Sequence, residues 1–351
     1  MGVTDSQEVL ELCKTQGFAL SGIAKAERTS HESSIIRWLE ESKHGEMEWL
    51  NRNVDVRLDP STLVEGAKSI ICVADRYGEL NEKPLPDGKG KVARYAQGMD
   101  YHMVIKRRLH HICDLLKEKC PEETFRTCVD TSPLLEREFA AKSGIGAIGK
   151  HTLLIEQGIG SWILLGAIVT TLELDPTPSK KTDPCATCTN CIDMCPTDAI
   201  TPWNVDARKC ISYLTIEHRN EIEPKYYKKI GKWIFGCDIC QEVCPHNQPT
   251  QKASLVQKHD AYETIVESLD VQEVIAWDEE SRKMAISGTS LKRAKLSMMR
   301  RNAVIVAGNI LLESQCSELL FKIEQIARND EDPIVQKSAT EVLKLLNNSA
   351  S

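Results

Sequence analysis

The sequence predicts three successive domains: an α/β (or α+β) domain over residues 1–175, a small cysteine-rich domain over residues 176–255 and an all-helical domain over residues 256–351. Three observations support this division. Short apolar runs alternate with amphipathic stretches in the first half, eight of the 14 cysteines fall between residues 185 and 244, and residues 300–347 repeat a helical period. A chain of 351 residues is also long enough for two or three compact domains.

Strands and helices are expected to alternate in the amino-terminal domain. The run AKSIICVA is continuously apolar, as in a strand that is buried on both faces. Strands are expected at residues 67–74, 125–129, 152–155 and 162–171, and helices at residues 101–119 and 134–142. This alternation predicts an α/β core.

A glycine pattern in the same domain does not predict a nucleotide site. Residues 144–149 match G-x-G-x-x-G, but they lead into a strand-like run instead of opening a helix. A dinucleotide-binding site needs the helix, because its amino terminus holds the pyrophosphate.

The second half of the chain begins after a stretch rich in Pro, Thr, Ser and Asp at residues 174–184, which marks a domain boundary. Beyond residue 255 the chain is expected to be helical to its end. Three helices are predicted at residues 302–312, 317–327 and 333–346, with an Asp-Glu-Asp-Pro break before the last. This arrangement is similar to a HEAT-type helical repeat.

The cysteine-rich domain carries two related motifs. Residues 185–196 form the complete ferredoxin run C-x2-C-x2-C-x3-C-P, whereas residues 237–245 lack the usual first cysteine because Ile234 stands in its place. Cys210 is the natural substitute. In two-cluster ferredoxins the fourth cysteine of each run ligates the other cluster. The sequence therefore predicts two [4Fe-4S] clusters in a ferredoxin-like domain, one held by Cys185, Cys188, Cys191 and Cys244, the other by Cys195, Cys210, Cys237 and Cys240.

Two other interpretations of cysteines remain open at this point. Zinc sites also use C-x2-C pairs, although they seldom combine them with the ferredoxin run. The cysteines outside the motifs are expected to be buried thiols that behave as small apolar side chains. They are Cys13, Cys72, Cys113, Cys120, Cys128 and Cys316.

Charge and hydropathy restrict the class of protein. A net charge of −7 argues against a uniformly basic nucleic-acid-binding protein, yet residues 282–301 hold seven basic residues and no acidic one. A second basic group comprises Lys225, Lys228, Lys229 and Lys232. The apolar runs are too short to cross a bilayer and the amino terminus lacks a secretory or twin-arginine signal, so we expect a cytoplasmic protein without a membrane span, and a monomer.

Five segments together resemble the epoxyqueuosine reductase family. They are residues 94–102 (RYAQGMDYH), 129–137 (VDTSPLLER), 144–154 (GIGAIGKHTLL), 210–215 (CISYLT) and 236–241 (GCDICQ). The resemblance implies an enzyme that uses cobalamin (vitamin B12) and two [4Fe-4S] clusters to remove the epoxide oxygen from epoxyqueuosine at the wobble position of certain tRNAs. It also implies an unidentified low-potential electron donor as a partner.

The resemblance also suggests which residues form the active site. Cobalamin contacts are implied at Arg57, Asp130, Leu154, Leu165, Ser212, Cys237 and Asp238. Asp130 is implied as the general acid, with a carboxyl pKa raised by burial beside the corrin. Its position after a predicted strand fits a ligand site at the carboxyl ends of strands. On the residues alone, Asp130 could instead cap the next helix.

Two positions, His102 and Ala93, lie where the chain departs from patterns found in other cobalamin proteins or relatives. Asp100 and His102 begin the cobalamin motif D-x-H-x-x-G, but Ile105 stands where the glycine should be. We therefore interpret His102 as structural or substrate-facing, with a cobalt ligand as the alternative. Ala93 occupies a place where some relatives carry a cysteine, so no thiol chemistry is assigned there.

The substrate implied by the resemblance is a polyanion, the anticodon stem-loop of tRNA, and its backbone is expected to lie on basic residues of the 282–301 stretch. The expected contacts are Lys292, Arg293, Arg300 and Arg301. Two rival functions share the cluster domain: a reductive dehalogenase, which usually carries a twin-arginine signal, and an electron-transfer subunit that docks on a larger enzyme.

Overall fold

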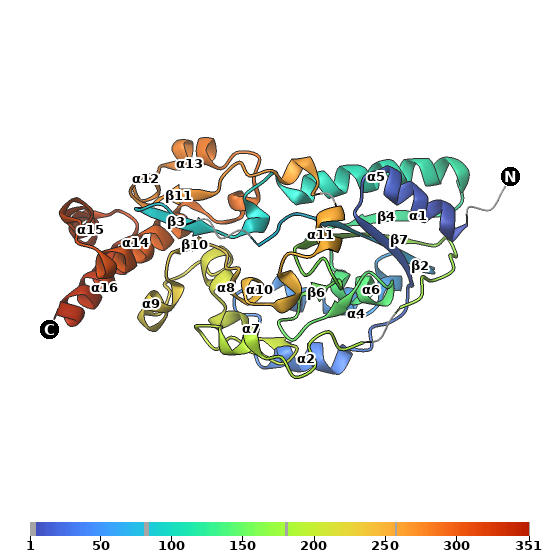
Figure 1. The fold of residues 1–351 in the computed structure, drawn as a ribbon, viewed down its shortest axis with the longest axis horizontal. Helices are drawn as coiled ribbons and strands as arrows, with labels where there is room; N and C mark the ends of the chain where they lie inside the picture. Colours follow the sequence, from blue (N-terminus) through green and yellow to red (C-terminus); the bar gives the residue numbers. More distant parts are fainter. Residues whose placement is uncertain (1–4, 81–83, 180–181, 257, 351) are drawn as a thin grey trace.

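The computed structural model describes residues 5–80, 84–179, 182–256 and 258–350, and it is elongated, with the two termini at opposite ends (Figure 1). The amino-terminal sheet and its helices occupy one end, the last three helices occupy the other, and the cysteine-rich segment lies between them. None of the described helices is both long enough and apolar enough to span a bilayer.

A four-stranded sheet forms the core of the amino-terminal region. Its order is β1 (Leu20–Lys25), β2 (Ser69–Arg76), β7 (Ile163–Thr170) and β4 (Phe125–Cys128). Strands and helices alternate as predicted, but every neighbouring pair in this sheet is antiparallel, which is an α+β arrangement. The carboxyl ends of the strands therefore do not converge on one edge. The sequence predicts Asp130 at a ligand site formed by the carboxyl ends of the strands, and the antiparallel order of the sheet removes the basis of that prediction.

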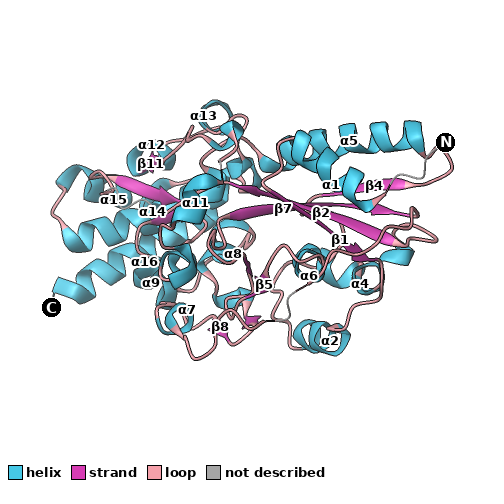
Figure 2. Cartoon of the chain, turned by 45° about the vertical axis from the view of Figure 1, so that its right-hand side comes forward, coloured by secondary structure: helices cyan, strands magenta, loops and turns pink. Residues whose placement is uncertain are grey.

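Both faces of this sheet are covered by helices (Figure 2). Ile71 and Val73 point to the face under α1 (Ser6–Thr15) and α5 (Tyr101–Lys119), whereas Ile70 and Cys72 point to the face under α6 (Glu136–Lys142). Successive side chains of a strand alternate between faces, so a strand buried on both sides must be apolar at every position. This explains the continuous apolar run that predicted β2.

Shorter elements complete the amino-terminal and central regions. The helices are α2 (Glu32–Glu40), α3 (Trp49–Arg52), α4 (Val54–Leu58), α7 (Asn190–Asp193), α8 (Ile211–Ile216), α9 (Tyr227–Ile230), α10 (Ile239–Glu242) and α11 (Gln251–Leu255). The two-residue strands β5 (Ala147–Ile148) and β6 (Leu154–Ile155) pair with each other, as do β8 (Ile200–Thr201) and β9 (Asn204–Val205). The glycine-rich motif thus contains β5 and leads into β6, within the strand expected at residues 152–155, and it opens no helix.

A second sheet joins the three predicted domains. It has the order β10 (Trp233–Phe235), β3 (Lys89–Val92) and β11 (Ser268–Asp270), so each predicted domain contributes one strand. The expectation of helix alone beyond residue 255 is wrong at β11. Three residues are too few to show a period in sequence, and β11 forms by pairing with the distant β3. The predicted boundaries stay a prediction, and this sheet crosses both of them.

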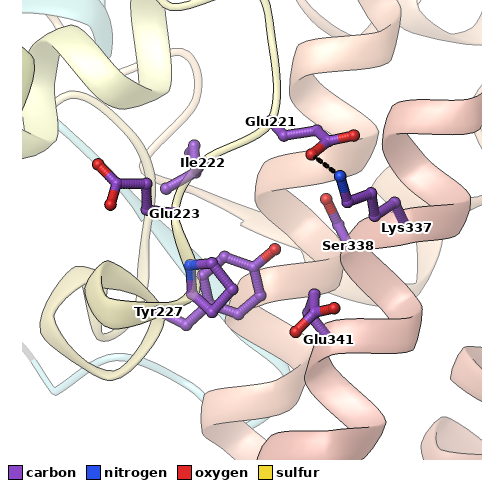
Figure 3. Close-up of a pocket in the computed structure, with 8 residues that line it drawn as sticks. Glu221, Ile222, Glu223, Tyr227, Lys337, Ser338 and Glu341 are labelled. Carbon is purple, nitrogen blue, oxygen red and sulfur yellow. Dashed lines mark ion pairs between the residues drawn. The ribbon is translucent and has the colours of Figure 1, made fainter.

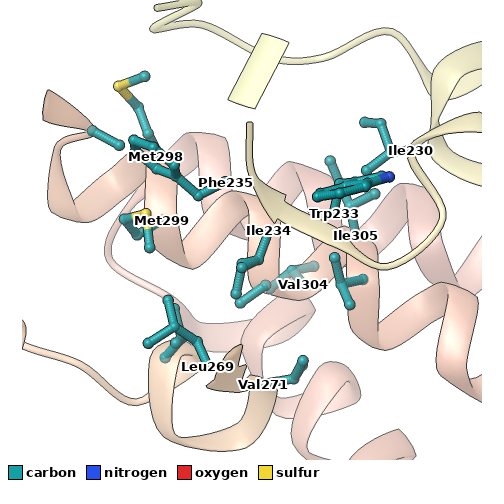
Figure 4. Close-up of a cluster of buried hydrophobic side chains, with 14 of the residues drawn as sticks. Ile230, Trp233, Ile234, Phe235, Leu269, Val271, Met298, Met299, Val304 and Ile305 are labelled. Carbon is teal, nitrogen blue, oxygen red and sulfur yellow. The ribbon is translucent and has the colours of Figure 1, made fainter. Parts of the chain in front are cut away.

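The carboxy-terminal region contains α12 (Val271–Ile275), α13 (Glu279–Ala285), α14 (Leu296–Glu313), α15 (Ser317–Asn329) and α16 (Pro333–Ala350). The last three lie where the sequence predicts helices; their likeness to a HEAT repeat stays a prediction. Residues of α14 and β10, including Met299, Val304, Ile234 and Phe235, share one apolar core (Figure 4). Helix α14 therefore packs on the cysteine-rich segment as well as on α16.

Polar side chains of α14 also bind the main chain of that segment. The Arg301 guanidinium donates hydrogen bonds to the carbonyl oxygens of Leu214 (2.7 Å), His218 (2.8 Å) and Asn220. The Asn302 amide donates to the carbonyl oxygens of Thr215 and Ile234, both at 2.9 Å. Asn309 binds the carbonyl oxygens of residues 227 and 231 in the same way. Buried carbonyl groups need such partners, so α14 completes the fold of the cysteine-rich segment.

Candidate active site and cluster region

A chain of charged hydrogen bonds lies at the amino terminus of α5. Asp100 caps this helix by accepting a hydrogen bond from the main-chain N–H of His102. His102 Nδ1 lies 2.7 Å from Asp100 Oδ1, and His102 Nε2 lies 3.0 Å from Asp130 Oδ2. Lys292 Nζ extends the chain at 2.5 Å from the other oxygen of Asp100. The imidazole is therefore held between two carboxylates.

The two carboxylates determine the charge of His102. Burial alone would lower the pKa of the imidazole, but the hydrogen bonds and charges of Asp100 and Asp130 outweigh it and raise the pKa to about 9. His102 is thus an imidazolium at neutral pH. Both ring nitrogens are engaged by carboxylates, so binding of cobalt would require one of these hydrogen bonds to break; the alternative of a cobalt ligand stays a prediction.

Asp130 has a constrained backbone and an accessible carboxylate. Its φ angle is +47°, a left-handed conformation uncommon outside glycine, and its N–H donates to Glu136 Oε1 at 3.0 Å. The side chain is 58% exposed. The next helix, α6, has Leu135 at its N-cap position and no side-chain cap, so Asp130 is not a helix cap.

The pKa of Asp130 differs from the expectation. Burial favours the neutral acid, but the hydrogen bond from His102 and the charges of His102, Arg137 and Arg293 prevail and lower the pKa below its ordinary value. The predicted rise of this pKa is therefore wrong for the protein without a ligand. A neighbour shows the opposite behaviour, since burial and the charge of Asp130 raise the pKa of Glu136 to about 8. In this pair of carboxyls Glu136 holds its proton more tightly.

Arg57 lies within the electrostatic influence of Asp130 and Glu136. The negative charges of Asp130 and Glu136 act on its guanidinium, although burial outweighs them and lowers its pKa. Within the described part of the chain, Arg57 Nε is buried and has no hydrogen-bond partner. An unsatisfied buried donor is costly, so this atom marks a position where a polar ligand atom would be stabilised.

The other predicted cofactor contacts lie on several elements. Leu154 is buried in β6 and Leu165 is half-buried in β7, while Ser212 lies half-buried on α8. Cys237 and Asp238 precede α10.

Asp238 is fully buried and accepts hydrogen bonds from the main-chain N–H (2.8 Å) and Nη1 (3.1 Å) of Arg94; burial raises its pKa to about 6. Burial also raises the pKa of the Tyr95 hydroxyl, and the charges of both Asp130 and Asp238 add to that rise. The Tyr95 hydroxyl therefore lies within the electrostatic influence of both Asp130 and Asp238.

The eight motif cysteines form two neighbouring sets. The electrostatic influence of Cys185, Cys188 and Cys244 raises the pKa of Cys191, in addition to burial. In the second set, burial raises the pKa of Cys240, and Cys210 and Cys195 add to it; Cys191 of the first set acts on it too. In the described residues, no group of three or more His, Cys, Asp or Glu side chains is arranged to hold a single metal ion. The motif cysteines of the two runs thus lie near one another, and their division into two ligand sets stays a prediction.

Four of the six remaining cysteines are fully buried, as expected. Burial raises the thiol pKa of Cys13, Cys72 and Cys113 to about 12 and that of Cys128 to about 11. Thiols of this kind are unreactive. Cys120 and Cys316 are half-buried.

The predicted tRNA-binding residues divide into two kinds. Arg301 is fully buried with its donors on main-chain carbonyls, and Arg300 is 19% exposed and paired with Asp330. Arg301 is therefore wrong as a phosphate contact, and Arg300 is committed to an internal ion pair. Lys292 and Arg293 are 58% and 47% exposed; Lys292 pairs with Asp100, whereas Arg293 pairs with Glu217 at 2.8 Å and its charge acts on Asp130. A basic run in sequence does not reveal which of its members face inward.

A cavity of about 290 Å³ lies apart from these residues, between residues 221–227 and α16 (Figure 3). Its lining includes Glu221, Glu223 and Glu341, and Glu221 is paired with Lys337. This acidic lining would repel a phosphate backbone.

Sequence reasoning did not single out Glu136, Arg137 or Tyr95 for a role. Each lies inside a segment that carries the family resemblance, so its position was quoted without its chemistry. Their proximity to Asp130 depends on the left-handed turn at that residue, and sequence alone gives no signal for it.

Comparison with known proteins identifies the chain's relatives. Residues 184–247, which include all eight motif cysteines, match the 4Fe-4S double cluster binding domain. Residues 57–131 match the family described as epoxyqueuosine reductase QueG, DUF1730. An epoxyqueuosine reductase of Leadbetterella byssophila is 36% identical over 305 residues, which cover 86% of this chain and 98% of that protein. The chain belongs to the epoxyqueuosine reductase family.

Two further comparisons extend over nearly the whole chain. An epoxyqueuosine reductase of Cellulophaga algicola is 39% identical over 290 residues, covering 82% of this chain and 92% of that protein. A crystal structure of epoxyqueuosine reductase with an epoxyqueuosine-modified tRNA-Tyr stem loop has a TM-score of 0.85 at 25% identity, covering 98% of this chain and 90% of that one. The resemblance stated from sequence motifs is confirmed.

Proposed function

We propose that this chain is an oxidoreductase that reduces the epoxide of epoxyqueuosine to queuosine in tRNA. The observation that carries the proposal is similarity over nearly the full length to epoxyqueuosine reductases, one of which is bound to a modified tRNA stem loop. The reaction replaces two C–O bonds by a carbon–carbon double bond and releases the oxygen as water. It consumes two electrons and two protons.

Two [4Fe-4S] clusters supply the path for the electrons. One would be held by Cys185, Cys188, Cys191 and Cys244, the other by Cys195, Cys210, Cys237 and Cys240. The match of residues 184–247 to the 4Fe-4S double cluster binding domain supports two clusters, and the influence of Cys191 on Cys240 supports their lying close together. The electrons come from a low-potential donor. Reconstituted protein is expected to contain eight iron and eight sulfide per chain, and four of each would contradict this allocation.

Cobalamin is proposed as the second cofactor, and the structure offers a test of fit. The unpartnered Arg57 Nε, beside Asp130 and Glu136, is a donor that a polar ligand would satisfy. The cofactor would be held by Arg57, Asp130, Leu154, Leu165, Ser212, Cys237 and Asp238. When bound, it supplies a cobalt centre that can pass electrons one at a time. His102 is not among the residues that would hold the cofactor, because both of its ring nitrogens are engaged by carboxylates.

One of the two protons comes from the His102–Asp130 pair, and the other comes from solvent, which reaches the exposed carboxyl of Asp130. His102 holds a proton up to a pH of about 9, and Asp130 Oδ2 lies 3.0 Å from His102 Nε2. The exposed Asp130 carboxyl can therefore present this proton to the oxygen that leaves the epoxide, and the imidazole restores it. The low pKa of Asp130 alone would leave no acid at neutral pH, so the pair acts as one unit.

Lys292 and Arg293 are proposed to hold the tRNA backbone near this pair. Both are exposed, and Arg293 stacks at 5.2 Å over the ring of Trp49. An arginine on an aromatic ring keeps its charge while its orientation is fixed, which suits a phosphate contact.

The decisive experiment incubates the anaerobically reconstituted protein with epoxyqueuosine-containing tRNA, cobalamin and titanium(III) citrate. Nucleosides are then analysed by mass spectrometry. Conversion to queuosine that requires both cobalamin and protein is expected. No conversion by a preparation with eight irons and bound cobalamin would refute the function, and conversion that does not need cobalamin would refute that cofactor.

A further inference from the structure

Within the glycine-rich motif at residues 144–154, only Leu154 has a role in the function described so far. In the structure its glycines allow a tight hairpin between β5 and β6. A Cβ on Gly146 would lie 2.4 Å from the Ile155 carbonyl oxygen, and one on Gly149 would lie 2.5 Å from Ile155 Cδ1. Larger residues would push the two strands apart. The turn that follows carries Lys150, whose residue is only 7% exposed.

The side chain of Lys150 donates hydrogen bonds to the loop that carries Cys185 and Cys188. Its Nζ donates to the carbonyl oxygens of Ala186 at 2.7 Å and Cys188 at 2.9 Å. Its main-chain N–H donates to Cys185 Sγ at 3.3 Å. One residue thus brings both a buried positive charge and an N–H···S hydrogen bond to the set that contains Cys185, Cys188, Cys191 and Cys244.

Trp203 covers this lysine from the outside. It sits at the tip of the β8–β9 hairpin, where its φ angle is +56°, and its side chain is half exposed. Its main-chain N–H donates to the Lys150 carbonyl oxygen at 3.0 Å, and its indole Nε1 donates to the Ile148 carbonyl oxygen at 3.2 Å. Lys150 Nζ lies 5.8 Å from the ring centroid. The indole therefore limits the access of water to the ammonium group and also attracts its charge.

The second cysteine set receives different contacts. Cys195 Sγ accepts a hydrogen bond from the Ala199 N–H at 3.4 Å and lies 3.6 Å from the Thr197 hydroxyl, both neutral groups. Lys209, next to Cys210 in sequence, is exposed to solvent. Water screens an exposed charge, whereas a buried charge acts at close range through a medium of low polarisability.

We propose that Lys150, shielded by Trp203, raises the reduction potential of the cluster held by the first cysteine set. Reduction adds one negative charge to a cluster, and a buried cation beside it stabilises the reduced form. An N–H···S hydrogen bond acts in the same direction. Lys150 is thus a positioning and tuning residue that favours electron storage on this cluster. The inference rests on the proposed cluster allocation.

The test uses full-length protein reconstituted to eight irons, without cobalamin or tRNA. Lys150→Met keeps the aliphatic stem and removes the charge, Lys150→Arg keeps the charge, and Lys209→Met is the matched exposed control. Potentials are measured by titration with titanium(III) citrate, followed by electron paramagnetic resonance. Cys210→Ala, which leaves only the first cluster, identifies its signal. We expect Lys150→Met to lower the equilibrium constant for reduction of that cluster about tenfold, which equals about 59 mV for one electron.

Lys150→Arg and Lys209→Met are expected to leave both potentials unchanged. Trp203→Ala should shift the same potential downward by less than Lys150→Met and make it dependent on salt, since water then reaches the ammonium. Unchanged potentials in Lys150→Met and Trp203→Ala would overturn the proposal. If Lys150→Met does not retain eight irons, Trp203→Ala decides alone, because an unshifted, salt-independent potential there also overturns it. These readouts need no turnover, so a failure of the epoxyqueuosine assay would not affect them.

Discussion

Replacement of Asp130 by asparagine should separate proton delivery from binding. Asparagine has the shape of aspartate and tolerates the left-handed backbone at this position. It removes one of the two carboxylates that raise the pKa of His102 from 6.5 to about 9, a rise worth about 3 kcal/mol at 1.36 kcal/mol per pKa unit. Loss of one partner should therefore lower this pKa by about one unit or more.

Nuclear magnetic resonance titration of His102 in cobalamin-free protein with oxidised clusters measures this change directly. Turnover of Asp130→Asn should fall about 10²- to 10⁴-fold, the usual contribution of a general acid, while iron content, cobalamin binding and tRNA binding persist. Wild-type turnover should decline as the pH rises through about 9, where His102 loses its proton. Asp100→Asn is the matched control: it should also lower the His102 pKa but retain more turnover, because Asp130 stays in place.

The stability of the fold should follow the same ionisation. The pKa of His102 is higher in the folded chain than in the unfolded chain, so the imidazolium contributes its full stabilisation below pH 6.5 and loses it as the pH rises through about 9. An unchanged His102 pKa in Asp130→Asn, together with near-normal turnover, would refute the proposed proton source.

Three further outcomes are expected. Cys210→Ala should retain four irons and lose four, measured by iron analysis and absorption spectra, whereas eight retained irons would show that Cys210 is not a ligand. Arg301→Met should lower the free energy of unfolding by about 3–5 kcal/mol, because it leaves buried carbonyl groups without donors. Thermal unfolding measures this change, and an unfolding temperature equal to that of the wild type would contradict the reasoning. Joint replacement of Lys292 and Arg293 by methionine should weaken tRNA binding and flatten its salt dependence without loss of cobalamin, and an equal salt slope would remove both from the interface.

Local patterns in the sequence predicted many of the helices and strands. The helix over residues 101–119 lies where the sequence predicts it, and the continuous apolar run at residues 67–74 predicted the strand that forms as β2 at Ser69–Arg76. The antiparallel order of the sheet could not be derived in this way, since periodicity says which residues are buried but not how strands pair. The strand β11 escaped notice for the related reason that its partner β3 is distant in the chain.

In the candidate site, too, local sequence patterns predicted some features, whereas others depend on residues that meet only in the folded chain. Motif spacing predicts how the eight cysteines are grouped, because in two-cluster ferredoxins the fourth cysteine of each run ligates the other cluster. The role of Asp130 came from resemblance, and its low pKa came from His102, Arg137 and Arg293, which meet it only in the folded chain. Arg301 is the clearest failure. Its guanidinium has the composition of a phosphate contact but is buried against carbonyl oxygens.

The hydrogen bonds from α14 to the cysteine-rich segment also set an order of assembly. A ribosome releases a chain from its amino terminus, and helix α14, which supplies Arg301, Asn302 and Asn309, emerges well after the last motif cysteine. Until then the carbonyl groups of residues 214–231 lack their partners and β10 lacks its apolar cover. The segment from residue 214 to residue 235 therefore completes its hydrogen bonds and its apolar packing only after the tail has been synthesised.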